Sequence, residues 1–348
     1  MSVNQDFSLR LALTISRFIV ECRLLTANRY IRAAMTNNEF IDYFVTAHLD
    51  VKAGKPHQQP MPDYEKTENR WLALHGLGKF ETFRYLYSEC RSVDDFHQWL
   101  QDTRGADAVA KAARLFDGVT TAETELLAQP ILSPEQWQHW QEQGYLRIGG
   151  LVPIEHCERV KQFICDYQGI DLNNATTWYP NHSDWHGLML QVYQQPDMET
   201  IRRHPAVKQL FAELYETPNI AANTDKVSYN PPETEHWQFR HHALHWDIDH
   251  SRPPEYYIQG LIYLDDTPEE RGPLRLIPGF HQKYEAYQQQ FADPVAAQHA
   301  IEREAGAIPV PGRQGDIVVW LQTLPHAASI NRSDQPRFVQ YLSFTKLD

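Results

Sequence analysis

The sequence predicts an α+β protein in which a helical region precedes an antiparallel β barrel or sandwich. Up to about residue 116, apolar residues recur at steps of three and four, which is the period of an amphipathic helix. From Lys226 onward, short runs of β-forming residues are separated by turn residues such as Pro278-Gly279, with no regular helix between most of them. This order is typical of an antiparallel barrel or sandwich, and a chain of 348 residues has room for it beside a separate helical unit.

Composition limits the class of protein. A hydrophobic content of 42% and a charged content of 22% are ordinary for a globular protein. The formal net charge of -13 argues against nucleic acid or an anionic membrane as the main partner, because both need clustered Lys and Arg. The 4 cysteines have irregular spacings that fit neither a disulfide framework nor a zinc site, so a cytoplasmic protein is expected.

Residues 1–125 are expected to form a helical region of unknown role. Helices are expected at 40–51, 71–90 and 93–116. The apolar stripe at 9–35 is interrupted by arginines, so it falls short of the roughly 20 apolar residues that a membrane span needs. We interpret it as a packed amphipathic helix, with a transit peptide as the alternative.

Residues 132–348 are expected to form the strand-rich domain, after a boundary between residues 117 and 132. Ser133, Pro134 and Gln136 predict a helix that starts with a capping box, and Gly144 ends it. The elements expected after it are a strand at 145–148, a helix at 153–167, strands at 256–264, 274–277, 316–321 and 338–344, and a helical insertion at about 282–304.

The pattern H-x-D occurs at 48–50, 182–184 and 245–247. Residues two apart point about 200° apart on a helix but to the same face of a strand. The first copy lies in a helical stretch and the second in a loop, so His245 and Asp247 are the candidate metal ligands. A second His from a later strand, His326, would complete a set of two His and one carboxylate, which leaves open metal positions and suits non-haem Fe(II).

A hairpin connects His326 to a basic residue. If strands 316–321 and 338–344 pair across a turn centred between Asn331 and Arg332, His326 lies opposite Arg337, about 5 Å away at Cβ. The Arg337 guanidinium can then form a bidentate pair with a carboxylate beyond the metal. The expected carboxylate is the distal one of 2-oxoglutarate.

Each of these residues also has a simpler interpretation. His245 could be a hydrogen-bonded structural residue, and His326 follows Pro325 and could be a turn residue. Arg337 could pair with a surface carboxylate such as Asp334. Asp249 shares the strand face of His245 and is the rival carboxylate.

These motifs resemble the phytanoyl-CoA dioxygenase family of Fe(II)/2-oxoglutarate oxygenases, over about 132–344. They are, in order, Leu132-Ser133-Pro134-Glu135 with Gly144-Tyr145-Leu146, Asn230-Pro231-Pro232, His245-Trp246-Asp247, Tyr263-Leu264-Asp265-Asp266, Gly272-Pro273-Leu274, Pro278-Gly279-Phe280-His281, and Gly315-Asp316 followed by His326, Asn331 and Arg337. Two residues depart from the family pattern: Phe280 stands where the family usually has Ser, and Leu261 where an aromatic residue often flanks the cosubstrate.

The resemblance implies a double-stranded β-helix, or jelly-roll, core at 132–348. It implies Fe(II) as the cofactor, with His245, Asp247 and His326 as its ligands, and O2 and 2-oxoglutarate as cosubstrates, the latter anchored by Arg337. Gln259, Tyr229 and Ser329 are further candidates for contact with 2-oxoglutarate, and core or solvent-facing roles are equally open for these three.

The expected function is a dioxygenase that hydroxylates an unactivated C–H bond of a metabolite or natural product and releases succinate and CO2. Desaturation or cyclisation by the same chemistry stays open. Further candidates for the substrate pocket are Trp178, Tyr179, Trp185, His241, His242, Trp246, Asp249, His250 and Arg252. The alternative function is a non-catalytic metal-binding jelly roll that acts as a sensor or scaffold through its helical region.

Overall fold

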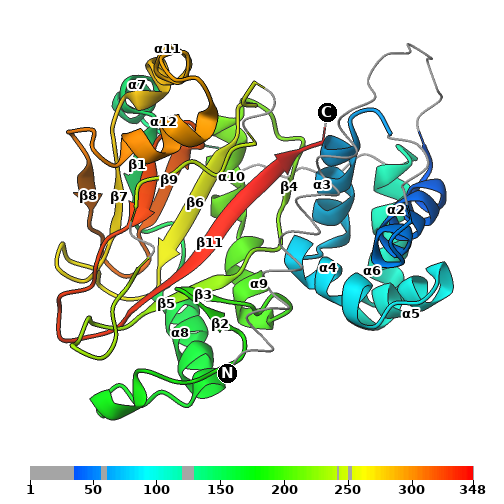
Figure 1. Cartoon of the computed structure of the whole chain (residues 1–348), viewed down its shortest axis with the longest axis horizontal. Coiled ribbons are helices and arrows are strands. Elements are labelled where there is room, and N and C mark those ends of the chain that lie inside the picture. Colours follow the sequence, from blue (N-terminus) through cyan, green and yellow to red (C-terminus); the bar gives the residue numbers. More distant parts are fainter. Residues whose placement is uncertain (1–34, 56–60, 120–128, 241–242, 250–252, 348) are drawn as a thin grey trace. The chain divides into compact units, whose positions relative to one another are not determined.

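The computed structural model describes residues 35–55, 61–119, 129–240, 243–249 and 253–347. Residues 1–34, with most of the predicted stripe at 9–35, lie outside this part of the chain. The fold divides between Glu123 and Thr124 into two compact units, a helical unit and a β unit (Figure 1). Within the described residues, no helix has both the length and the apolar character that a membrane crossing requires.

The helical unit contains more and shorter helices than the sequence predicted. The expected helix at 40–51 is confirmed, but the expected helices at 71–90 and 93–116 are each interrupted at a glycine with positive φ, Gly76 at 63° and Gly105 at 80°. A glycine adopts this conformation without steric cost and so ends a helix inside an otherwise continuous apolar pattern. The helices are α2 Asn37–Lys52, α3 Tyr64–His75, α4 Lys79–Ser88, α5 Val93–Arg104 and α6 Ala106–Phe116.

The β unit begins as the sequence predicted. Helix α7 (Pro134–Gln143) starts with the capping box of Ser133 and Gln136, ends at Gly144 and leads into strand β1 (Tyr145–Ile148) and helix α8 (Ile154–Gln168). The remaining elements are η1 Ala175–Thr177, β2 Trp185–His186, β3 Met189–Leu190, α9 Pro196–Arg202, α10 Pro205–Leu214, β4 Ile220–Ala222, β5 Val227–Asn230, β6 Ile258–Tyr263, β7 Leu274–Leu276, η2 Phe280–Gln282, α11 Tyr284–Gln288, α12 Pro294–Ile301, β8 Ile308–Val310, β9 Ile317–Leu321, β10 His326–Ala328 and β11 Arg337–Lys346. Helices α11 and α12 form the expected insertion.

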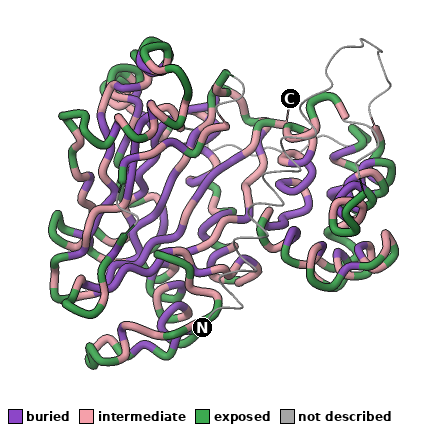
Figure 2. The backbone as a smooth tube through the Cα atoms, viewed as in Figure 1, coloured by how far each residue is buried: buried purple, intermediate pink, exposed green. Residues whose placement is uncertain are grey.

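Two antiparallel sheets make up the core. The large sheet has the order β1-β9-β6-β11-β5-β3-β2, with β4 also paired to β11, and the small sheet has the order β10-β7-β8. Alternate side chains of the large sheet, such as Tyr263 and Trp320, pack with Leu274 and Leu276 of the small sheet. The opposite side chains pack with the helices, and the central strands are buried along most of their length (Figure 2). The prediction of an α+β protein with a jelly-roll core is confirmed.

The predicted hairpin between the last strands is wrong. Strand β10 pairs with β7 in the small sheet, where His326 lies opposite Leu276. Strand β11 lies between β5 and β6 in the large sheet, where Arg337 lies opposite Asn230. The chain therefore crosses from one sheet to the other between these strands, so the turn composition at 331–336 did not reveal which strands pair.

Candidate metal centre

The first His of the candidate site is aligned with the second by backbone hydrogen bonds. His245 lies in an extended segment outside the named strands and forms an antiparallel bridge with His326. The amide N–H of each donates to the carbonyl of the other at 3.0 Å, and the ring centroids are 4.7 Å apart. Because directly opposed residues on neighbouring strands project to the same side, both imidazoles enter the same space.

Both imidazoles are oriented by carbonyls of their own chain segment. Nδ1 of His245 contacts Ala243 O at 3.0 Å, and Nδ1 of His326 contacts Leu324 O at 3.1 Å. A carbonyl oxygen only accepts hydrogen bonds, so Nδ1 carries the proton in both rings. The Nε2 atom of each His therefore has a free lone pair that could bind a metal, as in metal-binding imidazoles generally.

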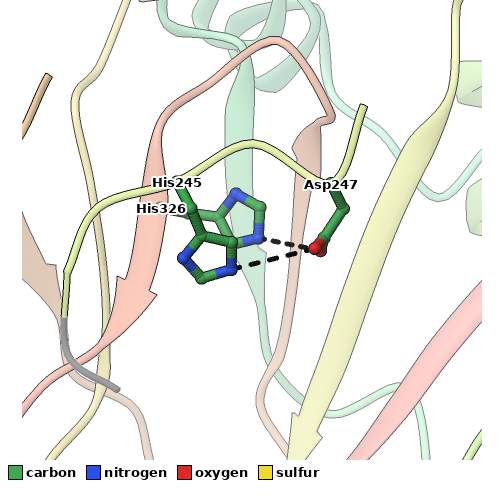
Figure 3. Close-up of side chains that lie close together, drawn as sticks. All are labelled: His245, Asp247 and His326. Atoms are coloured by element: carbon green, nitrogen blue, oxygen red, sulfur yellow. Dashed lines mark ion pairs between the residues drawn. The ribbon is translucent and has the colours of Figure 1, made fainter. Parts of the chain in front are cut away.

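Asp247 completes the cluster, because it follows His245 by two residues on extended backbone. Its Oδ1 lies 3.8 Å from Nε2 of His245, and its Oδ2 lies 3.3 Å from Nε2 of His326 (Figure 3). One ligand atom from each of the three residues lies within 4.8 Å of the others, the only such group of His, Cys, Asp and Glu in the described chain. Two imidazoles and one carboxylate form the donor set that non-haem Fe(II) takes in oxygenases.

The electrostatics of the cluster suit a cation. Burial lowers the pKa of His245, and the neighbouring His326 lowers it further. Burial alone would raise the pKa of Asp247, but contacts with His326, His245 and Gln259 hold it well below its ordinary value. The carboxylate is therefore ionised at neutral pH, and its negative charge beside the two Nε2 atoms suits a bound cation.

Gln259, a predicted contact of the cosubstrate, forms a hydrogen bond with Asp247. Its Nε2 donates to Asp247 Oδ2 at 2.7 Å, and its Oε1 accepts from Trp320 Nε1 at 3.1 Å. Both hydrogen-bonding ends of the amide are thus in use within the protein.

Arg337 is enclosed between the two sheets. Its side chain is 1% exposed, so the interpretation as a surface partner of Asp334 is wrong. Nη1 donates to Gly272 O at 2.9 Å, Nη2 donates to Ser228 Oγ at 3.0 Å, and Nε has no acceptor. Among the described residues, no carboxylate pairs with this guanidinium, although a buried charge is costly unless an opposite charge accompanies it. A carboxylate from a ligand would satisfy this requirement.

The other two predicted contacts of the cosubstrate are Tyr229 and Ser329, and the structure places Tyr229 on the face of its strand that points away from Arg337. Tyr229 lies opposite Phe338 and packs into the core on the helix-covered face, where its hydroxyl donates to Trp178 O at 2.9 Å. It therefore faces away from Arg337, and the adjacent Ser228 contacts Arg337 instead. Ser329 follows β10, and its carbonyl accepts from Asn230 Nδ2 at 3.4 Å. The sequence contained a signal for Ser228, because residues next to each other in a strand face opposite sides.

The rival groups lie apart from this cluster. Asp249 is not a member of the group formed by His245, Asp247 and His326. In the second H-x-D copy, the side chain of His182 accepts from the backbone N–H of Asp184. The carboxylate of Asp184 accepts from Tyr167 of α8, so both side chains have hydrogen-bond partners outside the cluster. His241, His242, His250 and Arg252, which were candidates for the substrate pocket, lie outside the described residues.

The sequence matches one protein family over more than half of its length. A profile described as phytanoyl-CoA dioxygenase (PhyH) matches residues 140–339. A protein of Dictyostelium discoideum whose name assigns it to the phytanoyl-CoA dioxygenases is 22% identical over 264 residues, which cover 59% of this chain and 73% of that protein.

Solved structures show weaker likeness. The non-heme alpha ketoglutarate dependent carbocyclase SnoK from nogalamycin biosynthesis has a TM-score of 0.48 at 19% identity, covering 64% of this chain and 88% of that one. EctD from S. alaskensis has a TM-score of 0.47 at 15% identity, with 65% and 81% covered. Both TM-scores are below 0.5, so neither neighbour indicates what this chain does.

The matched region contains the whole cluster and its surroundings, from Ser228 to Arg337. The chain therefore belongs to the phytanoyl-CoA dioxygenase (PhyH) family, as an oxygenase that uses Fe(II) as its cofactor and 2-oxoglutarate and O2 as cosubstrates.

Proposed function

We propose that this enzyme hydroxylates an unactivated C–H bond of a small-molecule substrate, with release of succinate and CO2. The ligands of the iron in this proposal are His245, Asp247 and His326, and Arg337 anchors the distal carboxylate of 2-oxoglutarate. The observation that carries the proposal is the convergence of two Nε2 atoms and one carboxylate, all within 4.8 Å of one another.

The bound ferrous ion, with 2-oxoglutarate and O2, supplies the oxidising power that removes hydrogen from the substrate. The protein residues hold the reactants. Arg337 fixes one end of the cosubstrate through a charge-assisted pair, while Ser228 and the carbonyl of Gly272 fix the guanidinium itself. Asp247 would occupy the third protein position on the metal, which would favour hydroxylation over halide transfer, because halide transfer needs that position free.

Three polar side chains on or next to strands of the large sheet interact electrostatically with Asp247. Burial lowers the pKa of Lys226, and the charge of Asp247 opposes this shift. Burial raises the pKa of Tyr257 and of Tyr341, and the charge of Asp247 adds to both of these shifts. The Asp247 side chain is 57% accessible and the three neighbours are only partly buried, so these residues face an open space rather than a packed core. An ammonium and two phenolic hydroxyls in this position support a polar metabolite as the substrate class.

The proposal can be tested without knowing the substrate, by measuring the conversion of 2-oxoglutarate to succinate. Metal-free protein is loaded with Fe(II) and 2-oxoglutarate under nitrogen and exposed to O2, and succinate is measured. We expect slow succinate release from the wild type, faster release with the correct member of a metabolite panel, and no release from Asp247→Ala or His326→Ala. If the wild type releases no succinate and 2-oxoglutarate does not shift its melting temperature, the hydroxylase proposal fails and the scaffold alternative is favoured.

A further inference from the structure

Two hydrogen bonds link a buried tryptophan to the candidate metal ligand Asp247. Trp320 Nε1 donates to Gln259 Oε1 at 3.1 Å, and Gln259 Nε2 donates to Asp247 Oδ2 at 2.7 Å. An indole N–H can only donate, so the amide oxygen of Gln259 must face Trp320 and its NH2 group must face the carboxylate. The orientation of the amide is therefore determined by its neighbours on both sides.

The same tryptophan also contacts a second candidate ligand. The Trp320 ring lies 5.2 Å from the ring of His326, at an interplanar angle of 52°. Trp320 is 2% exposed, so neither its ring nor its N–H is available to solvent as an alternative partner. One side chain is thus in contact with His326 directly and with Asp247 through Gln259.

The two linking residues belong to the most regular part of the β unit. Gln259 on β6 and Trp320 on β9 are directly opposite each other in an antiparallel pair of the large sheet. Asp247 itself lies outside the named strands, two residues after the single bridge at His245. The large sheet can therefore orient the Asp247 carboxylate through Gln259 and Trp320, although Asp247 itself belongs to no strand of that sheet.

We propose that Gln259 and Trp320 are positioning residues that hold one oxygen of Asp247, so that the carboxylate ligates the ferrous ion through its other oxygen alone. This inference rests on the proposed function, because it takes Asp247 to be a metal ligand. A carboxylate with both oxygens free can bind a metal through one or both of them. Ligation through both would occupy one of the open positions that the cosubstrates need in a site of two His and one carboxylate. Partners of this kind are known to orient metal ligands and to tune metal affinity.

The test compares metal binding in matched variants. Metal-free protein is titrated with Co(II) under nitrogen, and the dissociation constant and the visible spectrum are recorded. We expect Gln259→Met, which keeps the volume and removes the donor, to weaken Co(II) binding roughly 10- to 100-fold and to change the spectrum. Trp320→Phe, which keeps an aromatic ring beside His326 and removes the N–H donor, should change the Co(II) dissociation constant and the spectrum in the same direction as Gln259→Met, but to a smaller extent.

Two control variants lose a comparable hydrogen bond elsewhere in the same unit. Gln340→Met removes the donor to Met198 O at 2.8 Å, and Trp140→Phe removes the donor to Tyr256 Oη at 3.0 Å. Both side chains are buried and belong to no part of the cluster. These variants should bind Co(II) as the wild type does.

A second measurement tests whether the metal keeps an open coordination position for 2-oxoglutarate. The affinity of the Co(II)-loaded protein for 2-oxoglutarate is measured by its spectral change, and we expect it to fall in Gln259→Met and to stay unchanged in Gln340→Met. Wild-type Co(II) and 2-oxoglutarate affinities in Gln259→Met would overturn the proposal. The proposal would also be overturned if Gln340→Met lost affinity to the same extent and both metal-free variants melted at a lower temperature, because that pattern indicates a general packing defect.

The two layers of inference fail in different ways. If Asp247→Ala binds Co(II) as tightly as the wild type, the metal-site assignment is wrong, whatever Gln259→Met does. If Asp247→Ala loses binding and Gln259→Met does not, the site stands and the positioning role is rejected.

Discussion

The two units carry the same three-residue pattern with opposite outcomes. In the helical unit, the ring nitrogens of His48 contact Tyr87 Oη at 3.0 Å and Tyr64 Oη at 3.4 Å, and Asp50 pairs with Lys55 at 3.7 Å. In the β unit, the Nε2 atom of His245 and Oδ1 of Asp247 lie 3.8 Å apart. The same residue types are thus separated in one unit and brought together in the other.

The difference comes from the backbone. A helix turns by about 100° per residue, so His48 and Asp50 point to different sides of α2, one into the core and one toward solvent. An extended segment returns to the same face every second residue. The pattern H-x-D therefore has a chemical meaning only on extended backbone, and the presence of a later His facing the same space decides whether it can hold a metal.

A second contrast concerns the free nitrogen of each buried His. In the helical unit, Nδ1 of His75 contacts the Trp71 carbonyl one turn earlier at 2.9 Å, and its Nε2 is buried without a partner. In the β unit, Nδ1 of His326 contacts the carbonyl two residues earlier, and its Nε2 faces Asp247. A local carbonyl orients both rings, but only the second presents its free nitrogen to a carboxylate.

The largest expected effect is on metal binding. Asp247→Ala should weaken Fe(II) or Co(II) binding by more than the roughly 10- to 100-fold typical of losing an indirect partner, because it removes a direct ligand. Asp50→Ala, in the helical copy of the pattern, should leave binding unchanged. Calorimetric titration of the metal-free proteins checks both, and equal affinity in Asp247→Ala and Asp50→Ala would contradict the comparison.

The next effect concerns the buried guanidinium. Arg337→Met should raise the KM for 2-oxoglutarate about 10- to 150-fold, because hydrogen bonds to a charged group contribute about 1.5–3 kcal/mol. Without cosubstrate, the variant should melt no lower than the wild type. The substitution removes a buried guanidinium that has no carboxylate partner among the described residues, and so removes the cost of burying that charge. A lower melting temperature with an unchanged KM would mean that Arg337 is structural only.

The third effect distinguishes the buried His of the helical unit. Burial lowers the pKa of His75 from 6.5 to about 4, against the opposing effect of the Trp71 carbonyl. Between pH 6.5 and about 4 the unfolded state binds the extra proton, so the free energy of unfolding falls as the pH falls through this window. At about 1.36 kcal/mol per pKa unit, the loss is on the order of 3 kcal/mol.

His75→Leu removes the titrating group and should flatten this dependence. Urea unfolding at several pH values, read from α3 peptides by hydrogen–deuterium exchange at a fixed labelling pH, measures it. If the free energy of unfolding of the variant falls as steeply as that of the wild type when the pH is lowered, other groups cause the effect.

The smallest expected effect tests strand alternation. Ser228→Ala removes one acceptor of Arg337 and should raise the KM for 2-oxoglutarate about 2- to 10-fold with little change in kcat, because one hydrogen bond contributes about 0.5–1.5 kcal/mol. Its neighbour variant Tyr229→Phe loses the hydrogen bond to Trp178 O on the opposite face and should leave the KM unchanged. Succinate release against 2-oxoglutarate concentration distinguishes them, and the reverse ranking would place the cosubstrate elsewhere.

Local rules predicted much of the β unit. The capping box at Ser133 and Gln136 and the strands near Leu274 and Ile317 follow from residue types within a few positions. The pairing of His245 with Asp247 follows from the period of a strand. In the helical unit the same rules missed the interruptions at Gly76 and Gly105, because a single glycine does not disturb an apolar period.

Long-range pairing could not be predicted in this way. Whether β10 pairs with β11 or with β7 depends on which sheet each strand joins, and no local residue pattern specifies that choice. The contact between Arg337 and Ser228 and the link from Trp320 through Gln259 both depend on such pairings, β11 with β5 and β6 with β9. These contacts were therefore missed, although each residue involved was visible in the sequence.

The central claim is that His245, Asp247 and His326 bind one ferrous ion together. Crystals grown anaerobically with Fe(II) allow its position to be measured by anomalous diffraction at the iron edge. The account predicts a single anomalous peak within bonding distance of both Nε2 atoms and one carboxylate oxygen, with 2-oxoglutarate extending from it to Arg337 when the cosubstrate is added. A peak bound elsewhere, or no peak among these three residues in iron-loaded protein, would contradict it.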